Sequence, residues 1–527
     1  MTEALIFFDW SASLIACAPY AQTGAAMEKL KFFSNGEYRE SQTTVYYELH
    51  NPSTGEVTGM APRCTEAEVK EAVEAAKAAY PSWSATPVAK RTQILYRVRE
   101  LLMEHMEELT MLVARENGKT WSEAEGDVLK AKEGTELATQ APSLMMGDSL
   151  MDASSGFDTV QYREPMGVFA GIVPVNFPAM IPFGWMTPVC LACGNTMVLK
   201  AASLTPMTAL RIAGLYKEAG LPDGVLNVVT CSREETKVLL EHPDIKGITF
   251  VGSTAVGKYI YETAAGNGKR VQALCQAKNH ALIMKDVPLE RTVAGVINSA
   301  FGCAGQRCMA LSCCVVEEDI ADAFVEELIR QAKEIKIGPA WEKTSKLGPI
   351  TYEAHYKEIL ADIEKGIKEG ASLVLDGRDC VVKGYENGYF IGPTVFDHVS
   401  EDMSIGREEI FGPVLCVKRV KNFEEGLSLM NGNPYANGSV IFTQSGYYAR
   451  EFVRHTDGGM VGVNVGIPVP IGFVPFAGHK NSFFGDLHCL GKDAYRFFTE
   501  SKCVTTRWFD EEEKKNKEVS TWDGTIW

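Results

Sequence analysis

The 527-residue sequence predicts an α/β fold with two doubly wound domains, and three observations support this expectation. Strand-like apolar runs alternate with helix-like segments from about 166 to 274, as in a parallel sheet covered by helices. A second alternating stretch runs from about 280 to 465. Apolar residues make up 46% of the chain and charged residues 23%, which is typical of a globular protein.

The N-terminal part of the chain is predicted to be helical. Thr65 and Glu68 have the spacing of a capping box, and apolar residues follow at helical intervals. A second helix is predicted to begin near Pro87. This helical region is predicted to end at Gly118, because glycine readily adopts the left-handed conformation that terminates a helix.

From residue 166 onward, short apolar runs predict strands, and apolar residues spaced three and four apart predict helices. The predicted strands lie at 166–173, 195–200, 224–229, 248–251 and 271–274. The predicted helices lie at 206–219, 233–241 and 255–265. Because helices separate these strands, most of them are expected to lie parallel in one sheet.

Charge and composition argue against several classes of partner. The net charge of −16 disfavours a broad nucleic-acid surface, which requires clustered lysine and arginine. Residues 167–199 carry no charge, but their four prolines would break a membrane-spanning helix. Residues 1–26 lack the basic start of a secretory signal and are predicted to be a disordered extension. We therefore expect a cytoplasmic protein with reduced cysteines.

Two common ligand motifs fail in this sequence. No G-x-G-x-x-G fingerprint occurs, and the G-x4-G-K segment that starts at Gly252 continues with Tyr259. A phosphate-binding loop needs a serine or threonine at that position to hold magnesium. Cys190 and Cys193 form a single C-x-x-C pair without the second pair that a zinc site requires, so no metal site is expected.

Five motifs occur in a fixed order along the chain. They are PVNFP (174–178), FVGST (250–254), FGCAGQRCMALS (301–312), GYFIGPT (388–394) and EEIFGP (408–413). Together they resemble the aldehyde dehydrogenase superfamily over about residues 30–508. The segments GQRCMALS, SFFGDLH and VTTRW resemble its CoA-acylating methylmalonate-semialdehyde dehydrogenase branch.

The resemblance implies a division of the chain. We expect an NAD-binding domain at 27–274, interrupted by an oligomerisation arm at 147–165, and a catalytic domain at 275–475. A return segment that completes the β arm is expected at 476–508, and a charged tail at 509–527. The resemblance further implies a homotetramer or a homodimer.

The resemblance also assigns the two catalytic residues. Cys308 is the expected nucleophile, because a thiolate can add to an aldehyde and leave as part of a thioester. Its neighbours Cys303, Cys313 and Cys314 are expected to be structural. Asn176 is expected to stabilise the oxyanion together with the backbone N–H of Cys308.

NAD is the cofactor that the resemblance implies. Lys200 is assigned to ribose hydroxyls, and Glu409 is assigned to the nicotinamide ribose. The further expected cofactor contacts are Ser203, Gly252, Ser253 and Phe411. The usual family pattern places a glutamate three residues after the lysine, whereas this chain has Ser203 there, which leaves NADP open as an alternative.

The sequence departs from the hydrolytic members of the family at one decisive position. Those members carry Glu-Leu-Gly-Gly-Lys, and their glutamate activates the water that cleaves the thioester. Here the segment reads Leu-Cys-Gln-Ala-Lys, and Leu274 cannot act as a base. We therefore expect a second thiol, that of coenzyme A, to accept the acyl group.

Two cations are candidates for binding an anionic substrate. Arg307 precedes the nucleophile, and a guanidinium binds a carboxylate through two hydrogen bonds. Lys130 stands where the semialdehyde branch has a second arginine. The expected substrate is malonate or methylmalonate semialdehyde, which would be converted to acetyl-CoA or propionyl-CoA with decarboxylation. Two alternatives stay open: another small anionic aldehyde, such as a sulfonated one, and a non-catalytic NAD-binding scaffold.

Overall fold

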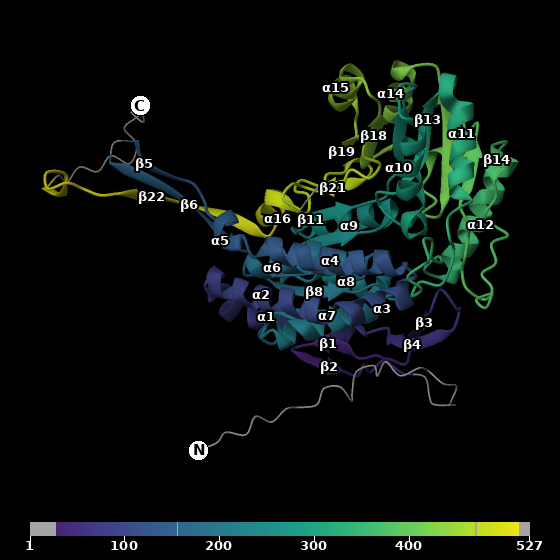
Figure 1. Cartoon of the computed structure of the whole chain (residues 1–527). Helices are drawn as coiled ribbons and strands as arrows, with labels where there is room; N and C mark the ends of the chain where they lie inside the picture. The colour runs from purple at the N-terminus through teal and green to yellow at the C-terminus, as the bar shows by residue number, and fades with distance from the viewer. Residues whose placement is uncertain (1–27, 155, 470–471, 516–527) are drawn as a thin grey trace.

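The computed structural model describes residues 28–154, 156–469 and 472–515. Two large sheets and a smaller three-stranded sheet organise the chain, and helices pack against the large sheets (Figure 1). This architecture confirms the predicted α/β fold class. The predicted extension at 1–26 and the tail residues 516–527 lie outside the described residues.

The first sheet contains the five strands that the sequence predicted, and neighbouring members of this set run parallel. Their order is β9-β8-β7-β10-β11, so the winding reverses beside β7. These strands are β7 (Val168–Ile172), β8 (Thr196–Lys200), β9 (Leu226–Val229), β10 (Ile245–Val251) and β11 (Arg270–Leu274). Three antiparallel edge strands were not predicted: β1 (Phe32–Ser34), β2 (Glu37–Arg39) and β21 (Phe483–Gly485).

Helices cover both faces of the first sheet. One buried apolar cluster joins a face to α1 (Glu66–Ala85), α8 (Arg233–Glu241) and α9 (Thr254–Gly266). A second cluster covers the opposite face with α2 (Val88–Glu104), α3 (Met106–Asn117), α4 (Trp121–Ala138), η2 (Ile181–Met186), α6 (Thr187–Ala192) and α7 (Met207–Glu218). The predicted capping box at Thr65 and the predicted helix end at Gly118 are both confirmed. No described helix is long and apolar enough to cross a membrane.

The second sheet has the order β14-β15-β16-β13-β12-β18-β19, and only the β14 pair is antiparallel. Its strands are β12 (Asn279–Ile283), β13 (Leu311–Glu317), β14 (Ser372–Leu375), β15 (Thr394–Asp397), β16 (Val414–Val420), β18 (Gly438–Phe442) and β19 (Met460–Val463). The accompanying helices are α10 (Leu289–Phe301), α11 (Glu318–Ala332), α12 (Glu353–Lys368), α13 (Ser404–Arg407), α14 (Phe423–Gly432) and α15 (Gly446–His455).

A three-stranded sheet extends away from the body of the molecule (Figure 1). It consists of β5 (Ser149–Ser154), β6 (Phe157–Pro165) and β22 (Thr499–Arg507). All nine residues of β22 pair with β6. The remaining short strands are β3 (Tyr46–His50), β4 (Val57–Pro62), β17 (Tyr435–Ala436) and β20 (His479–Lys480).

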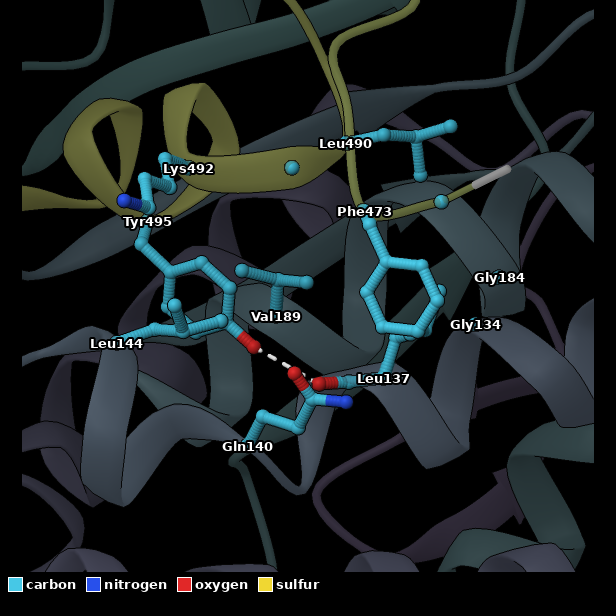
Figure 2. A pocket seen from close by; sticks show the side chains of 12 residues that line it. Gly134, Leu137, Gln140, Leu144, Gly184, Val189, Phe473, Leu490, Lys492 and Tyr495 are labelled. Carbon is cyan, nitrogen blue, oxygen red and sulfur yellow. Dashed lines mark hydrogen bonds between the residues drawn. The ribbon is translucent and has the colours of Figure 1, made fainter. Parts of the chain in front are cut away.

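An apolar cavity of about 240 Å³ lies at the base of this arm, between α4, α5 (Ala141–Leu144) and α16 (Gly491–Phe497). Figure 2 shows Leu137, Phe473 and Tyr495 in its wall, and the Tyr495 hydroxyl donates to the Leu137 carbonyl at 3.0 Å. None of the predicted site residues lines this cavity, so it is distinct from the predicted active site.

Candidate active site

The predicted site residues gather where strands of the first sheet end. Asn176 follows β7, Lys200 is the last residue of β8, Gly252 follows β10 and Leu274 is the last residue of β11. Because these strands run parallel, their carboxyl ends lie at one edge of the sheet, which is where α/β proteins commonly bind ligands. The loop that carries Cys308 meets this edge from the second domain, as the contacts described below show.

A left-handed turn precedes the predicted nucleophile. The turn is η3 (Gly302–Gly305), in which the φ values of Cys303, Ala304 and Gly305 are 51°, 52° and 72°. Two residues with side chains therefore adopt a conformation that costs about 1 kcal/mol or more each. At Gly305 a Cβ atom would lie 2.0 Å from the Gly412 carbonyl oxygen, so only glycine allows this close approach. The neighbouring loop thereby fixes the turn.

Cys308 lies three residues after this turn and is partly exposed, whereas Cys303, Cys313 and Cys314 are buried. Its carbonyl oxygen accepts hydrogen bonds from the side-chain amides of Asn279, at 2.9 Å, and Asn437, at 3.3 Å. Burial raises the pKa of the Cys308 thiol to about 12, and the Glu409 carboxylate contributes to the rise. The thiol is therefore protonated at neutral pH and must lose a proton before it can attack.

Asn176 lies against the nucleophile loop. Its side chain is buried, and Nδ2 donates a hydrogen bond to the Gln306 carbonyl oxygen at 3.0 Å. An amide nitrogen carries two hydrogens, so one of them remains for a second acceptor. The structure thus brings Asn176 into contact with Gln306, two positions before Cys308 in the sequence. The oxyanion role of the Asn176 amide stays a prediction.

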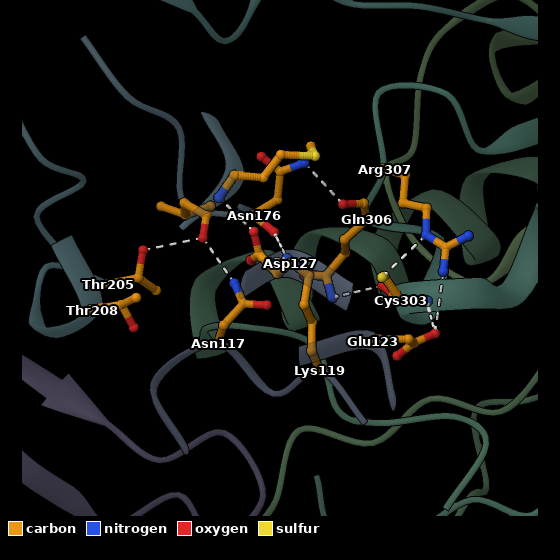
Figure 3. Close-up of polar contacts among 12 residues, drawn as sticks. Asn117, Lys119, Glu123, Asp127, Asn176, Thr205, Thr208, Cys303, Gln306 and Arg307 are labelled. Carbon is orange, nitrogen blue, oxygen red and sulfur yellow. Dashed lines mark hydrogen bonds and ion pairs between the residues drawn. The ribbon is translucent and has the colours of Figure 1, made fainter. Parts of the chain in front are cut away.

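Arg307 points toward the left-handed turn and α4, as Figure 3 shows. Its Nε donates to Cys303 Sγ at 3.1 Å, and its Nη2 lies 3.4 Å from Glu123 Oε1. Lys130 is outside this cluster: its side chain is 59% exposed, and its ammonium pairs with Glu133 at 2.6 Å. The structure therefore does not bring Arg307 and Lys130 together at one site, and a substrate contact of Lys130 stays a prediction.

Four of the residues predicted to bind the cofactor, Lys200, Ser203, Gly252 and Ser253, lie where strands β8 and β10 of the first sheet end. The Lys200 ammonium is 3.4 Å from the Ser203 hydroxyl, and burial lowers the pKa of Lys200. Ser253 is the N-cap of α9, and Gly252 links this cap to β10. The first N–H groups of α9 and its positive dipole end therefore face the edge of the sheet that Lys200 reaches.

Glu409 and Phe411 contribute from the second domain. Together with Gly305 and Arg307 they line a narrow cavity of only about 10 Å³ beside the nucleophile loop. Burial raises the pKa of the Glu409 carboxyl to about 8, while the Ala277 N–H donates to Oε1 at 3.4 Å. Sequence reasoning missed His355, whose Nε2 lies 2.8 Å from the Phe411 carbonyl oxygen. Nothing in the sequence marks it, because the two residues are 56 positions apart.

Comparison with known proteins identifies the family. A model of the aldehyde dehydrogenase family matches residues 38–504. The chain belongs to the aldehyde dehydrogenase family. Two relatives named malonate-semialdehyde dehydrogenase, from Geobacillus kaustophilus and Bacillus cytotoxicus, are 50% and 46% identical to it. Each alignment covers 92% of this chain and 99% of the relative, which confirms the resemblance read from the motifs.

Solved structures of the family share the fold. A protein from Sinorhizobium meliloti, named as a methylmalonate-semialdehyde dehydrogenase and complexed with NAD, superimposes with a TM-score of 0.90 at 41% identity. The match covers 92% of this chain and 99% of that one. A methylmalonate-semialdehyde dehydrogenase from Oceanimonas doudoroffii gives the same TM-score at 40% identity, with 93% and 100% covered.

Within this aldehyde dehydrogenase, Leu274 is buried at the end of β11. Its side chain is 4% exposed and belongs to the buried cluster that contains Met309 and Cys489. Cys308 packs against the same cluster. Position 274 therefore holds a buried hydrocarbon side chain, which offers no proton acceptor.

A buried ion pair supports the Asn176 loop, and sequence reasoning missed it. The Lys119 ammonium lies 2.7 Å from Asp127 Oδ2, and the two side chains are 2% and 0% exposed. Lys119 also donates to the Asn176 carbonyl oxygen and lies 3.6 Å from the centre of the Phe177 ring. Asp127 Oδ1 accepts from the Met180 N–H at 2.7 Å. The pair thus holds the loop at both ends.

We expect Lys119→Met to destabilise the enzyme strongly. The substitution leaves the Asp127 carboxylate buried without its cation, which costs about 3–5 kcal/mol. It also removes the donor that fixes the Asn176 backbone, so kcat should fall on the order of 100-fold. Urea unfolding and steady-state NADH formation measure the two effects.

The matched control is Lys70→Met, because the exposed Lys70 pairs with Glu66 on the surface of α1. Exposed pairs contribute at most about 1 kcal/mol, so this variant should behave like the parent enzyme. Equal losses of unfolding free energy in the two variants would show that the buried pair does not support the loop.

Proposed function

We propose that the enzyme oxidises malonate semialdehyde or its α-methyl derivative and transfers the acyl product to coenzyme A with loss of CO₂. The observation that carries this proposal is the position of Arg307, directly before the partly exposed Cys308 and beside the same narrow cavity as Glu409. A guanidinium at this point favours an aldehyde that carries an anionic group. The names of the relatives support the same substrate class.

NAD is the hydride acceptor that the described residues fit best. Lys200 contributes an ammonium whose one described partner is the Ser203 hydroxyl. Glu409 contributes a largely protonated carboxyl group whose oxygens have acceptor capacity to spare. The Lys200 ammonium and the Glu409 carboxyl group can bind the hydroxyls of the two NAD riboses, and the N–H groups in the first turn of α9 can bind the pyrophosphate. Because Ser203 replaces the family's glutamate, NADP is the second candidate.

The chain's own groups account for the first half of the reaction. The Cys308 thiol first releases its proton to solvent, and the thiolate sulfur then adds to the aldehyde carbon and gives a tetrahedral alkoxide. The remaining hydrogen of Asn176 Nδ2 and the Cys308 N–H are the donors proposed to stabilise that alkoxide. NAD, held by Lys200 and Glu409, would supply the hydride acceptor for this adduct. The product held on Cys308 is a thioester.

The second half follows from the apolar position at Leu274. One carbon separates the thioester carbonyl from the carboxylate, so the carbonyl accepts the electron pair that CO₂ leaves behind. The resulting enolate takes a proton from water and becomes the shortened acyl thioester. The shortened acyl group then needs a nucleophile, and no base at position 274 activates water. A CoA thiolate needs less activation than water, so transfer to CoA is the expected route.

We propose a homodimer or homotetramer in the cytoplasm. The three-stranded arm exposes Leu150, Met151 and Tyr162, and the adjoining Trp508 is 77% exposed. Exposed large apolar side chains clustered on one arm favour burial of that arm against a second copy of the chain. The cytoplasmic location rests on the cysteines, since every cysteine among the described residues is a free thiol.

The assignment of Arg307 is tested by comparing a carboxylated and a neutral aldehyde. Arg307→Leu should raise KM for malonate semialdehyde about 10-fold to 100-fold, since a charge-assisted pair contributes about 1.5–3 kcal/mol. KM for propanal should change less than about threefold. A sulfonated aldehyde in the same panel distinguishes the two anionic substrate classes.

The control for this test is Arg291→Leu, which removes an exposed arginine of α10 with the same change in net charge. It should leave both KM values unchanged. Equal losses on both aldehydes in Arg307→Leu would mean that Arg307 supports the Cys308 loop and does not bind the substrate's anion.

A further inference from the structure

The Arg307 guanidinium is held on one edge and on one face. Cys303 Sγ accepts from Nε at 3.1 Å, and Glu123 Oε1 lies 3.4 Å from Nη2, so both contacts fall on the Nε–Nη2 edge. The flat face lies over Gly302, where a Cβ atom would be 2.6 Å from Nη2 and 2.7 Å from Cζ. The side chain is therefore locked in one orientation (Figure 3).

Glu123 connects this arginine to the start of α4. Its Oε2 accepts from the Thr120 hydroxyl at 2.8 Å and from the Thr120 N–H at 3.1 Å, which completes a capping box. Its Oε1 accepts from the Cys303 N–H at 2.5 Å. The carboxylate is 13% exposed and is thus a fixed negative charge beside the guanidinium.

One end of the guanidinium is still available. Within the described part of the chain, no hydrogen bond involves Nη1, and Arg307 carries five N–H donors in all. An incoming carboxylate can therefore approach the Nη1–Nη2 end while Glu123 keeps the adjoining Nε–Nη2 edge. Two anions would then share one cation, and the nearer each lies, the more they repel each other.

We propose that Glu123 is a positioning residue that acts through Arg307 and limits the affinity of the enzyme for anionic aldehydes. This inference rests on the proposed function, because it takes Arg307 as the cation that binds the substrate's anion. Without substrate, Glu123 offsets the charge of the largely buried guanidinium. With substrate bound, the same carboxylate opposes the second anion.

Glu123→Gln tests this role, because glutamine removes the charge while its single oxygen can still accept from the Cys303 N–H, and its amide nitrogen can donate to the Thr120 hydroxyl. KM for malonate semialdehyde should fall about fivefold, and KM for propanal should stay within about twofold. The Ki of 3-hydroxypropanoate, which has the carboxylate but no aldehyde, should also fall about fivefold. This inhibition constant reports binding even if the variant turns over slowly.

Two controls separate the possible outcomes. Glu125→Gln removes an exposed charge from the same helix and should change neither KM nor Ki. In an Arg307→Leu background, Glu123→Gln should give no gain, as a double-mutant cycle requires if the effect passes through Arg307.

A rise or no change in the malonate-semialdehyde KM and the 3-hydroxypropanoate Ki of Glu123→Gln would overturn the inference. A gain that persists without Arg307 would do the same. If Arg307→Leu itself leaves the preference for the carboxylated aldehyde intact, the proposed function fails instead. The two failures are therefore distinguishable from the same set of variants.

Discussion

Cys308→Ala should abolish NADH formation while leaving NAD binding intact. Loss of the nucleophile removes the covalent step, and removal of such groups in other enzymes lowers kcat by about four to six orders of magnitude. The groups assigned to the cofactor lie on β8, α9 and the Glu409 loop, so the Kd for NAD should stay within about twofold. Steady-state assays and fluorescence titration with NADH measure the two quantities.

Two further cysteine variants complete this experiment. Cys503 is exposed on β22, so Cys503→Ala should retain full activity. Cys303 accepts a hydrogen bond from Arg307, so Cys303→Ala should mainly weaken the binding of an anionic substrate. An inactive Cys303→Ala together with an active Cys308→Ala would reverse the assignment of the nucleophile.

Omitting coenzyme A should stop the reaction after a single turnover. The thioester on Cys308 forms at the usual rate, but the buried Leu274 offers no base to activate water. We therefore expect one NADH per active site in a rapid burst, followed by a steady rate on the order of 100-fold below that with CoA. Stopped-flow absorbance at 340 nm resolves the two phases.

The matched control is S-methyl-CoA, which has the same shape as CoA but no free thiol. It should not restore turnover, whereas CoA should yield acetyl-CoA or propionyl-CoA that chromatography can detect. Rapid steady formation of the free acid without CoA would show that another group activates water, and transfer to CoA would then no longer be the expected route.

Local patterns in the sequence predicted the architecture well. The capping box at Thr65 and the helix end at Gly118 depend on residues within one turn, so their chemistry can be read directly. The alternation of strands and helices between 166 and 274 likewise follows from short-range apolar spacing. The edge strand β21 could not be predicted this way, because its partner β11 lies about 210 residues earlier.

The site was only partly predictable for the same reason. Family motifs pointed to Cys308 and Asn176, and the structure places both at the nucleophile loop. The contact between Glu123 and Arg307 spans 184 positions, and the left-handed conformation of Cys303 runs against the ordinary preference of a residue with a side chain. Such features depend on tertiary packing, which single-sequence patterns do not encode.

The return of the chain end to the first sheet has a consequence for biosynthesis. Strand β21 completes the edge next to β11, and β22 pairs with β6, which lies some 340 residues earlier in the chain. While the ribosome is still adding the last residues, the N-terminal sheet has an open edge, and β6 lacks its longest partner. Late closure of such distant pairs slows folding and leaves strands available for wrong pairing. Chaperone demand during synthesis should therefore persist until the final segment leaves the exit tunnel.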